Sequence, residues 1–415
     1  MSSAFSIALS ALQADSDAID ITGNNLANLN TTGYKGSSVQ FEDLISEYLG
    51  GQSGNGIGMG VSSPLAEQAF SQGSLQSSSE PMASAIQGGG FFVVQNPGGQ
   101  QEFTRDGSFT LNANGVLQTQ TGENVQGWMA TNGVVNSSGA PTDLVFPSGT
   151  ILPPKPTQNM TASINLDATS SAATNTFSAP IQVVDSLGNT HILTLDFTET
   201  AANTWSYNVT IPGSDLASNP AGNVSILSAP GTLTFNPDGS LASSNTSPVA
   251  LTVSGLADGA ANLAMNWNLF NPDGSGALTQ YDSTSSVAGT TQDGAQASQL
   301  SQVTVGNGGQ IMASYSNGQQ VVAGQLAMAA IENPGSLLNV GNNNYTVSGQ
   351  TATPAIGLPQ SGGRGQIIGG SLEGSNVDMG AEFTNLIVFQ SSYGANSKVI
   401  TTANTMSQDL LNLIQ

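Results

Sequence analysis

Residues 2–30, SSAFSIALSALQADSDAIDITGNNLANLN, predict an α-helix that needs a partner. One face of this helix repeats every four and then three residues, and five of its seven members are apolar: Phe5, Leu9, Leu12, Ser16, Ile19, Gly23 and Leu26. Asn and Thr residues at positions 28–32 are poor helix formers, and Gly33 is a residue type that ends helices. We therefore expect the apolar face to be a seam for a second helix, because such a helix is only marginally stable alone.

Residues 375–415 predict a second helix at the other end of the chain. Ser375 and Asp378 form an S-x-x-D capping pattern at its start. Its apolar residues recur at heptad-like positions: Phe383, Leu386, Tyr393, Ile400, Leu411 and Ile414. Helical apolar spacing usually means packing onto the chain's own core. Because both helices lie at the extremes and carry small polar residues in their seams, we favour packing between subunits.

The long interior between the two helices predicts β-structure. Its expected strands cover residues 91–94, 107–118, 181–184, 191–198 and 204–211, and turn sequences rich in Gly, Pro, Asn and Asp separate them. The fold class is thus α+β, with mainly β domains nested inside a terminal helical coiled-coil domain formed by both ends. We expect a helical core domain at 1–33 and 375–415, a connector at 34–75 and 360–374, an inner β domain at 76–146 and 285–359, and an inserted outer β domain at 147–284.

The charge balance excludes several classes of function. Five basic residues face 27 acidic ones, which gives a formal net charge of −22. Nucleic acids and anionic membrane surfaces both require clustered Lys and Arg, so we expect neither as a partner. The absence of cysteine excludes disulfides and thiolate metal sites. We also find no secretory signal after Met1 and no apolar run long enough for membrane insertion, and we expect another export route.

No pattern of residues predicts catalysis. His191 is the single histidine and lies in an expected strand, which favours a surface or packing role over a catalytic one. The sequence Asn-Pro-Asp-Gly-Ser occurs at 236–240 and 271–275, but it lacks the ligand series of a calcium loop and is typical of a turn. Carboxylate pairs could serve a glycosidase, yet the aromatic platforms that sugars need are few. We expect no catalytic residue, cofactor or metal ion.

Several motifs resemble those of the bacterial flagellar rod and hook family. Residues 22–28 (TGNNLAN) and 31–35 (TTGYK) resemble its N-terminal signature, which includes Asn24, Asn25, Ala27, Asn28, Thr32, Gly33, Tyr34 and Lys35. Residues 85–92, 104–109, 370–378 and 396–403 resemble further segments of the family. Residues 184–191, 203–205, 293–294 and 315–318 resemble the inserted domain and return strands of its hook members. One departure is that Gln390 precedes Ser391 and Ser392, where relatives commonly carry Arg.

This resemblance implies a structural subunit and not an enzyme. Hook members are exported by the flagellar type III apparatus without a cleaved signal and form a homopolymer, a curved hollow tube that passes torque from rod to filament. The implied partners are other copies, the flagellar rod, the hook cap, the hook–filament junction proteins and the export apparatus. Their terminal helices form the core around the channel. Two alternatives stay open: a distal rod subunit, and a surface adhesin or carbohydrate-active protein.

Overall fold

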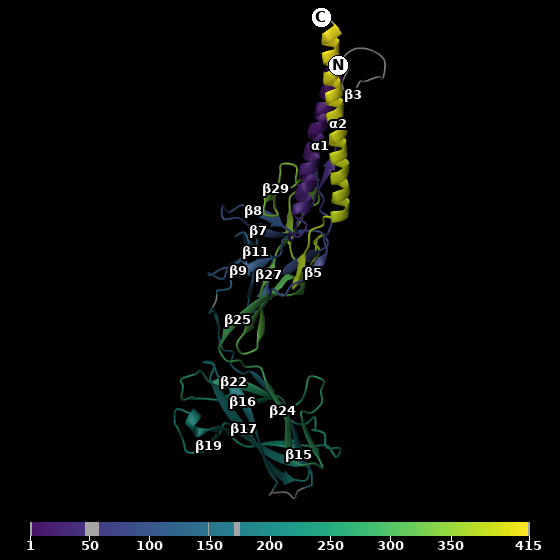
Figure 1. Cartoon of the computed structure of the whole chain (residues 1–415). Coiled ribbons are helices and arrows are strands. Elements are labelled where there is room, and N and C mark those ends of the chain that lie inside the picture. Colours follow the sequence, from purple (N-terminus) through teal and green to yellow (C-terminus); the bar gives the residue numbers. More distant parts are fainter. Residues whose placement is uncertain (1, 46–57, 148, 170–174, 414–415) are drawn as a thin grey trace. The chain divides into compact units, whose positions relative to one another are not determined.

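The computed structural model describes residues 2–45, 58–147, 149–169 and 175–413 (Figure 1). The chain divides into two compact units. The helix-bearing unit comprises Met1–Ser148, Gln302–Ser314 and Gln320–Gln415, and the inserted unit comprises Gly149–Ser301 and Tyr315–Gln319. Most of the regular structure is β, with one helix at each chain end, which confirms the predicted α+β class. Of the connector predicted at 34–75, residues 46–57 lie outside the described residues.

The two terminal helices, α1 (Ser2–Ala27) and α2 (Met379–Leu413), lie side by side (Figure 1). The face that α1 buries is made of small and polar residues: Ala8, Ala14, Asp15, Ala18, Thr22 and Asn25. Asn396 on α2 donates its amide to Asp15 Oδ2 at 3.0 Å, and Asn25 donates to Glu382 Oε1 at the same distance. Small side chains let the two backbones approach closely, and the polar pairs fix their register.

Both helices begin or end a few residues away from the predicted positions. α1 ends at Ala27, ahead of the expected Asn30, where the carbonyl of Asn24 accepts both the backbone N–H of Asn28 at 3.2 Å and its side-chain amide at 3.0 Å. α2 begins at Met379, because Asp378 is its N-cap. The Asp378 carboxylate accepts the backbone N–H groups of Gly380 at 2.8 Å and Ala381 at 3.2 Å.

The helix-bearing unit contains an antiparallel sheet in the order β27-β11-β7-β8-β30-β29. Its core contains Phe91, Phe103, Trp128 and Tyr345. The strands lying wholly or partly in this unit are β1 (Ser37–Gln40), β2 (Asp43–Ile45), β3 (Gly58–Val61), β4 (Leu65–Gln68), β5 (Leu75–Ser77), β6 (Ser84–Gln87), β7 (Phe91–Gln95), β8 (Gln101–Thr104), β9 (Phe109–Leu111), β10 (Leu117–Thr119), β11 (Asn124–Thr131), β12 (Val134–Val135), β13 (Thr142–Asp143), β25 (Ser298–Val305), β26 (Gln310–Tyr315), β27 (Gln320–Leu326), β28 (Met328–Ala330), β29 (Leu338–Gly341), β30 (Asn344–Thr346), β31 (Ala355–Gly357), β32 (Gln366–Gly369) and β33 (Ser371–Glu373). Two 3₁₀ turns, Asn307–Gly309 and Pro334–Ser336, accompany them.

The inserted unit has two sheets that share one apolar core. One has the order β21-β22-β15-β23 with β24 also on β15, and the other has the order β16-β17-β18-β19 with β20 on β18. Alternate residues of β17 are buried, and Trp205 and Trp267 are completely covered. The strands are β14 (Ile151–Leu152), β15 (Asn159–Asp167), β16 (Thr176–Val184), β17 (Thr190–Ala201), β18 (Thr204–Pro212), β19 (Asn223–Ser225), β20 (Gly231–Thr234), β21 (Val249–Val253), β22 (Leu263–Asn268), β23 (Leu278–Tyr281) and β24 (Ser286–Gln292), with a 3₁₀ turn at Gly213–Asp215.

The strand predictions are confirmed except for one. The segments predicted at 91–94, 181–184, 191–198 and 204–211 lie within β7, β16, β17 and β18. The segment predicted at 107–118 is wrong as one strand, because a turn closed by Gly115 N–H donating to the Asn112 carbonyl at 2.9 Å separates β9 from β10. Both Asn-Pro-Asp-Gly-Ser sequences form the expected turns, in which Gly239 and Gly274 donate to the carbonyls of Asn236 and Asn271.

Candidate functional site

The motif after α1 meets the segment before α2 inside the helix-bearing unit. Gly33 donates its N–H to the carbonyl of Glu373 at 2.8 Å, with a φ of +69°. A Cβ at this position would lie 2.6 Å from the backbone nitrogen of Asp106. Glycine is therefore required here for its backbone angle and for the close approach of the Arg105–Asp106 backbone.

A buried ion-pair triad lies beside this contact. The Glu373 carboxylate accepts from Lys35 Nζ at 2.7 Å and from Arg105 Nη1 at 3.3 Å. The side chains of Lys35 and Glu373 are 0% exposed, and that of Arg105 is 4% exposed. Burial lowers the pKa of both Lys35 and Arg105, and the charge of Glu373 opposes that shift. Three segments far apart in the sequence are thus held by one carboxylate.

Two asparagines connect the helices to the strands next to them. Asn25 donates to the Ser37 carbonyl at 2.8 Å and accepts from the Ser37 N–H at 2.9 Å, in addition to its bond with Glu382. Asn376, just before α2, accepts from Gly36 N–H at 2.8 Å and donates to the Ala69 carbonyl at 2.6 Å. These bonds fix where each helix leaves the β-structure.

The other motif residues lie around this junction. Tyr34 donates its hydroxyl to Asn25 Oδ1 at 3.3 Å, and the Thr32 carbonyl accepts from Asn343 at 2.9 Å. Asn28 donates to Asn24 Oδ1 at 2.8 Å, whereas Ala27 is exposed. The structure therefore brings the signature together as a structural junction between α1, α2 and the strands beside them.

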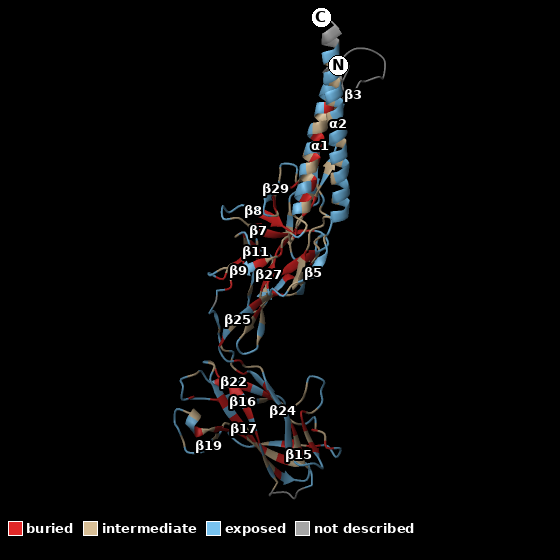
Figure 2. Ribbon diagram, viewed as in Figure 1, coloured by how far each residue is buried: buried red, intermediate tan, exposed pale blue. Residues whose placement is uncertain are grey.

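Of the nine predicted seam residues whose side chains are described, four are exposed and five are half-buried. Phe5 and Leu9 are 45% and 50% exposed, and Phe383 and Tyr393 are 50% and 43% exposed. The remaining described members are half-buried: Leu12, Ile19, Leu26, Leu386 and Ile400. Leu411 belongs to α2, but its side chain is outside the described part of the chain, as is all of Ile414. Figure 2 shows that much of the surface of both helices is exposed.

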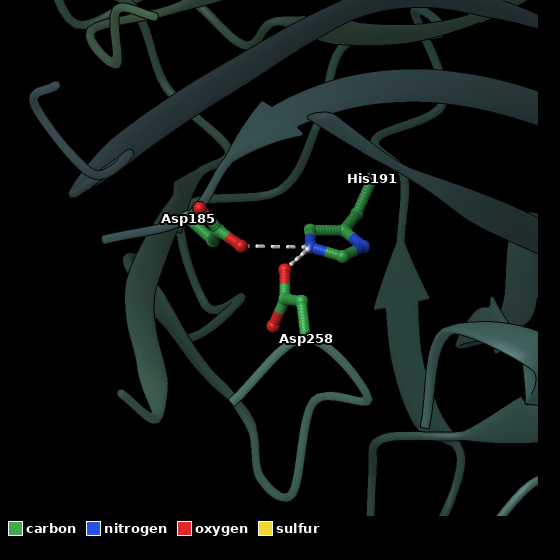
Figure 3. Close-up of side chains that lie close together, drawn as sticks. All are labelled: Asp185, His191 and Asp258. Atoms are coloured by element: carbon green, nitrogen blue, oxygen red, sulfur yellow. Dashed lines mark hydrogen bonds and ion pairs between the residues drawn. The ribbon is translucent and has the colours of Figure 1, made fainter. Parts of the chain in front are cut away.

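His191 has surroundings that the sequence does not reveal. It lies on β17, is buried, and has Asp185 and Asp258 close to its Nε2 atom (Figure 3). Nε2 is 3.2 Å from Asp185 Oδ2 and 3.7 Å from Asp258 Oδ2, and Nδ1 is 3.0 Å from Asp215 Oδ2. Burial lowers the pKa of His191, but the hydrogen bonds and charges of Asp215 and Asp185 outweigh it, so the net shift is upward. The expectation of an ordinary surface or packing residue therefore omitted its carboxylate partners.

Within the described residues, no helix is both long enough and apolar enough to cross a membrane.

Family models match most of the chain. Residues 5–35 match the flagella basal body rod protein model, and residues 368–413 match the flagellar basal body rod FlgEFG protein C-terminal model. Residues 85–174 match the flagellar hook protein FlgE/F/G D1 domain, and residues 152–295 match the flagellar basal body protein FlaE D2 domain. Together with the paired terminal helices, these matches place the chain in the class of flagellar rod and hook subunits.

Whole-chain relatives narrow this class to one family. The chain is 31% identical to flagellar hook protein FlgE of Treponema pallidum over 463 residues, covering 98% of each protein. It is 29% identical to that of Salmonella typhimurium over 422 residues, covering 99% of each. The crystal structure of Helicobacter pylori flagellar hook protein FlgE2 shares the fold, with a TM-score of 0.52, 13% identity, and coverage of 71% of this chain and 99% of that one. The chain belongs to the flagellar hook protein FlgE family.

Membership of this family defines the role of the chain. It is a structural subunit of the bacterial flagellar hook and not an enzyme, and it polymerises into the hook of the flagellar basal body, outside the cell. The distal rod, adhesin and carbohydrate-active alternatives are not favoured by these relatives.

Proposed function

We propose that copies of this chain assemble head to tail through their terminal helices into a curved hollow tube, which passes motor torque from the rod to the filament. A head-to-tail interface generates an open helical polymer and needs no two-fold symmetry. In this proposal the helices form the core around the channel, and the β-structure lies outside. The division into a helical core, a connector, an inner β domain and an outer β domain belongs to the same proposal.

The observation that carries the proposal is the exposure of α2. Between Met379 and Asp409, where its side chains are described, not one residue is buried. The large apolar residues that are exposed along α2 are Met379, Phe383, Ile387, Val388, Tyr393, Val399 and Met406. Covering one such side chain contributes about 1.5–3 kcal/mol, so a neighbouring copy that covers several would stabilise the helix strongly.

The side chains of α1 that bond to α2 do not belong to its predicted apolar seam. Asp15 and Asn25 bond to α2, whereas Phe5 and Leu9 on the predicted seam are exposed. The two helices of one chain thus form a pair that carries large exposed apolar residues on both members. This supports helix packing between copies at the seam residues, which the sequence pattern alone favoured over packing within one chain.

Export and partners follow from the same family membership. We propose that the subunit passes through the flagellar export apparatus without a cleaved signal and assembles beneath a hook cap. The rod and the hook–filament junction proteins then bind the two ends of the tube. Helices that are marginal alone suit this route, because they can remain unfolded in transit and fold when they dock.

Electron microscopy of the polymerised full-length protein tests the proposal. Curved tubes are expected for the hook, and straight rigid tubes would favour a rod subunit. Phe383→Asp, which puts a charge on the exposed face of α2, is expected to prevent tubes. Val134→Asp is the matched control, because Val134 is 69% exposed but lies in β12. Tubes that form equally well from both variants would contradict the assigned face.

A further inference from the structure

Three segments meet around His191 at one end of the inserted unit. They are the turn at 185–189 between β16 and β17, the 3₁₀ turn at Gly213–Asp215, and the loop between β21 and β22. Ala257 donates its N–H to the carbonyl of Asp215 at 2.9 Å, and Asn189 Nδ2 donates to Asp258 Oδ2 at 2.8 Å. The backbone therefore fixes three carboxylates around one imidazole.

The spacing of three side-chain atoms fits a single cation. His191 Nε2, an oxygen of Asp185 and an oxygen of Asp258 all lie within 4.8 Å of one another (Figure 3). The two oxygens are 3.2 Å and 3.7 Å from Nε2. Two ligands that bind zinc at its usual bond lengths of about 2.0–2.2 Å lie roughly 3.3 Å apart at the tetrahedral angle. These separations need little adjustment to hold one ion.

A second observation concerns how each ligand is oriented. Asp215 Oδ2 lies 3.0 Å from His191 Nδ1, a position that holds a proton on Nδ1 when Nε2 binds a metal. Asp185 Oδ1 accepts the N–H groups of Leu187 at 2.8 Å and Asn189 at 2.9 Å, which leaves Oδ2 directed at His191. Asp258 Oδ1 accepts the N–H of Ala260 at 2.9 Å. Outer partners of this kind hold ligands in many metal sites.

The charge of the cluster also favours a bound cation. Three carboxylates face one imidazole. Among the described residues, Asp185 and Asp258 form ion pairs only with His191. Asp185 is completely buried, so its charge is not screened by water. Either an imidazolium or a bound metal ion can supply the positive charge. One nitrogen ligand with two oxygen ligands favours zinc-type transition metals over calcium, which prefers an all-oxygen shell.

We propose that Asp185, His191 and Asp258 bind one divalent transition-metal ion of the zinc type, and that Asp215 orients the imidazole. The side chains of Asp258 and Asp215 are 25% and 26% exposed, which gives the ion access from solvent and leaves room for a water ligand. The ion ties the β16–β17 hairpin to the loop between β21 and β22, in a chain that has no cysteine for a disulfide. Binding displaces the proton from Nε2 and therefore strengthens as the pH rises.

The test is a titration of the unpolymerised full-length chain with Co²⁺, followed by its visible absorption and then by displacement with Zn²⁺. We expect one ion per chain. Asp258→Asn and His191→Gln are each expected to weaken binding at least ~10-fold, and Asp215→Asn by about 10–100-fold. Asp273→Asn, an exposed turn residue of the same unit, is the control and should bind like the unaltered chain.

Folding and protonation are measured on the same samples. Tryptophan fluorescence melting without metal shows whether each variant is folded, and Asp258→Asn is expected to remain so because Asp258 is partly exposed. NMR of the His191 ring should show loss of the Nε2 proton when Zn²⁺ saturates the chain. An absence of Co²⁺ binding, equal binding by Asp258→Asn, or a ring that stays protonated with Zn²⁺ present would each overturn the proposal.

Discussion

In the inserted unit Trp205 and Trp267 are completely buried, whereas in α2 the similarly apolar Phe383 and Ile387 are 50% and 63% exposed. The inserted unit closes two sheets over its own core, so each apolar side chain finds its contacts within one chain. The hydrogen bonds between the terminal helices are made by polar residues, and several large apolar residues of both helices stay exposed. The inserted unit thus buries its apolar residues within one chain, and we propose that neighbouring copies cover those of the helices.

A buried ion-pair triad and two exposed turn carboxylates differ in how much stability they add. The helix-bearing unit buries Lys35, Arg105 and Glu373 together at the junction below its helices. In the inserted unit, Asp238 and Asp273 are exposed and each caps its own turn, accepting the backbone N–H of Ser240 or Ser275 at 2.9 Å. A buried triad fails if one member is lost, whereas an exposed turn tolerates change.

The largest expected effect comes from deleting residues 379–415, which removes α2. Tubes should be lost completely, because the remaining helix has neither its partner in the chain nor the exposed face of α2. Fluorescence melting should show the inserted unit still folded, since its core contains no residue of α2. Electron microscopy reads out assembly, and tubes formed by the truncated chain would refute the role of the helices.

Glu373→Gln should strongly destabilise the helix-bearing unit. The substitution leaves Lys35 and Arg105 buried without their carboxylate, a loss of about 3–5 kcal/mol for a broken buried pair. Calorimetry is expected to show a lower melting temperature for this unit and an unchanged melting temperature for the inserted unit. Glu332→Gln, at an exposed position, serves as the control. Equal melting of both variants would mean that the triad adds no stability.

Leu12→Asp should block assembly with little change in the melting of the β-structure. Leu12 is half-buried on the seam of α1, where a charge would lie in the apolar contact between copies. Sedimentation of the polymer measures the effect as a rise in the protein concentration needed for assembly. Gln13→Asp introduces the same charge at an exposed neighbour and should assemble normally. Normal hooks from Leu12→Asp would show that the seam lies on another face.

The smallest expected effect is on the stability of the inserted unit at acid pH. Hydrogen bonds from Ser240 and Ser275 lower the pKa of Asp238 and Asp273 below the usual 3.8. A carboxyl group whose pKa is lower in the folded state adds stability above its unfolded pKa, and that stability is lost as the pH falls through the folded pKa. The melting temperature of the inserted unit should therefore decrease as the pH is lowered below about 4. The variant Asp238→Asn with Asp273→Asn should show a shallower fall, and an identical profile would exclude this contribution.

The sequence predicted both helices, the turns at 236–240 and 271–275, and four of the five strands expected from it, because these depend on local periodicity and turn chemistry. It could not show that α1 bonds to α2 through Asp15 and Asn25, since the residue that follows each of them in the sequence belongs to the seam, whose apolar pattern is stronger. The triad was missed because Lys35 and Glu373 are 338 positions apart and only the fold pairs them. The partners of His191 were hidden for the same reason, although the hairpin between β16 and β17 gave one clue by placing Asp185 close to it.

Cryo-electron microscopy of the assembled polymer tests the central claim most directly. At side-chain resolution, Phe383 and Ile387 of α2 and Leu9 of α1 are expected to be buried against the helices of neighbouring copies, around a central channel. A polymer in which these residues remain exposed to solvent, with all contacts between copies made by the β-structure, would contradict it.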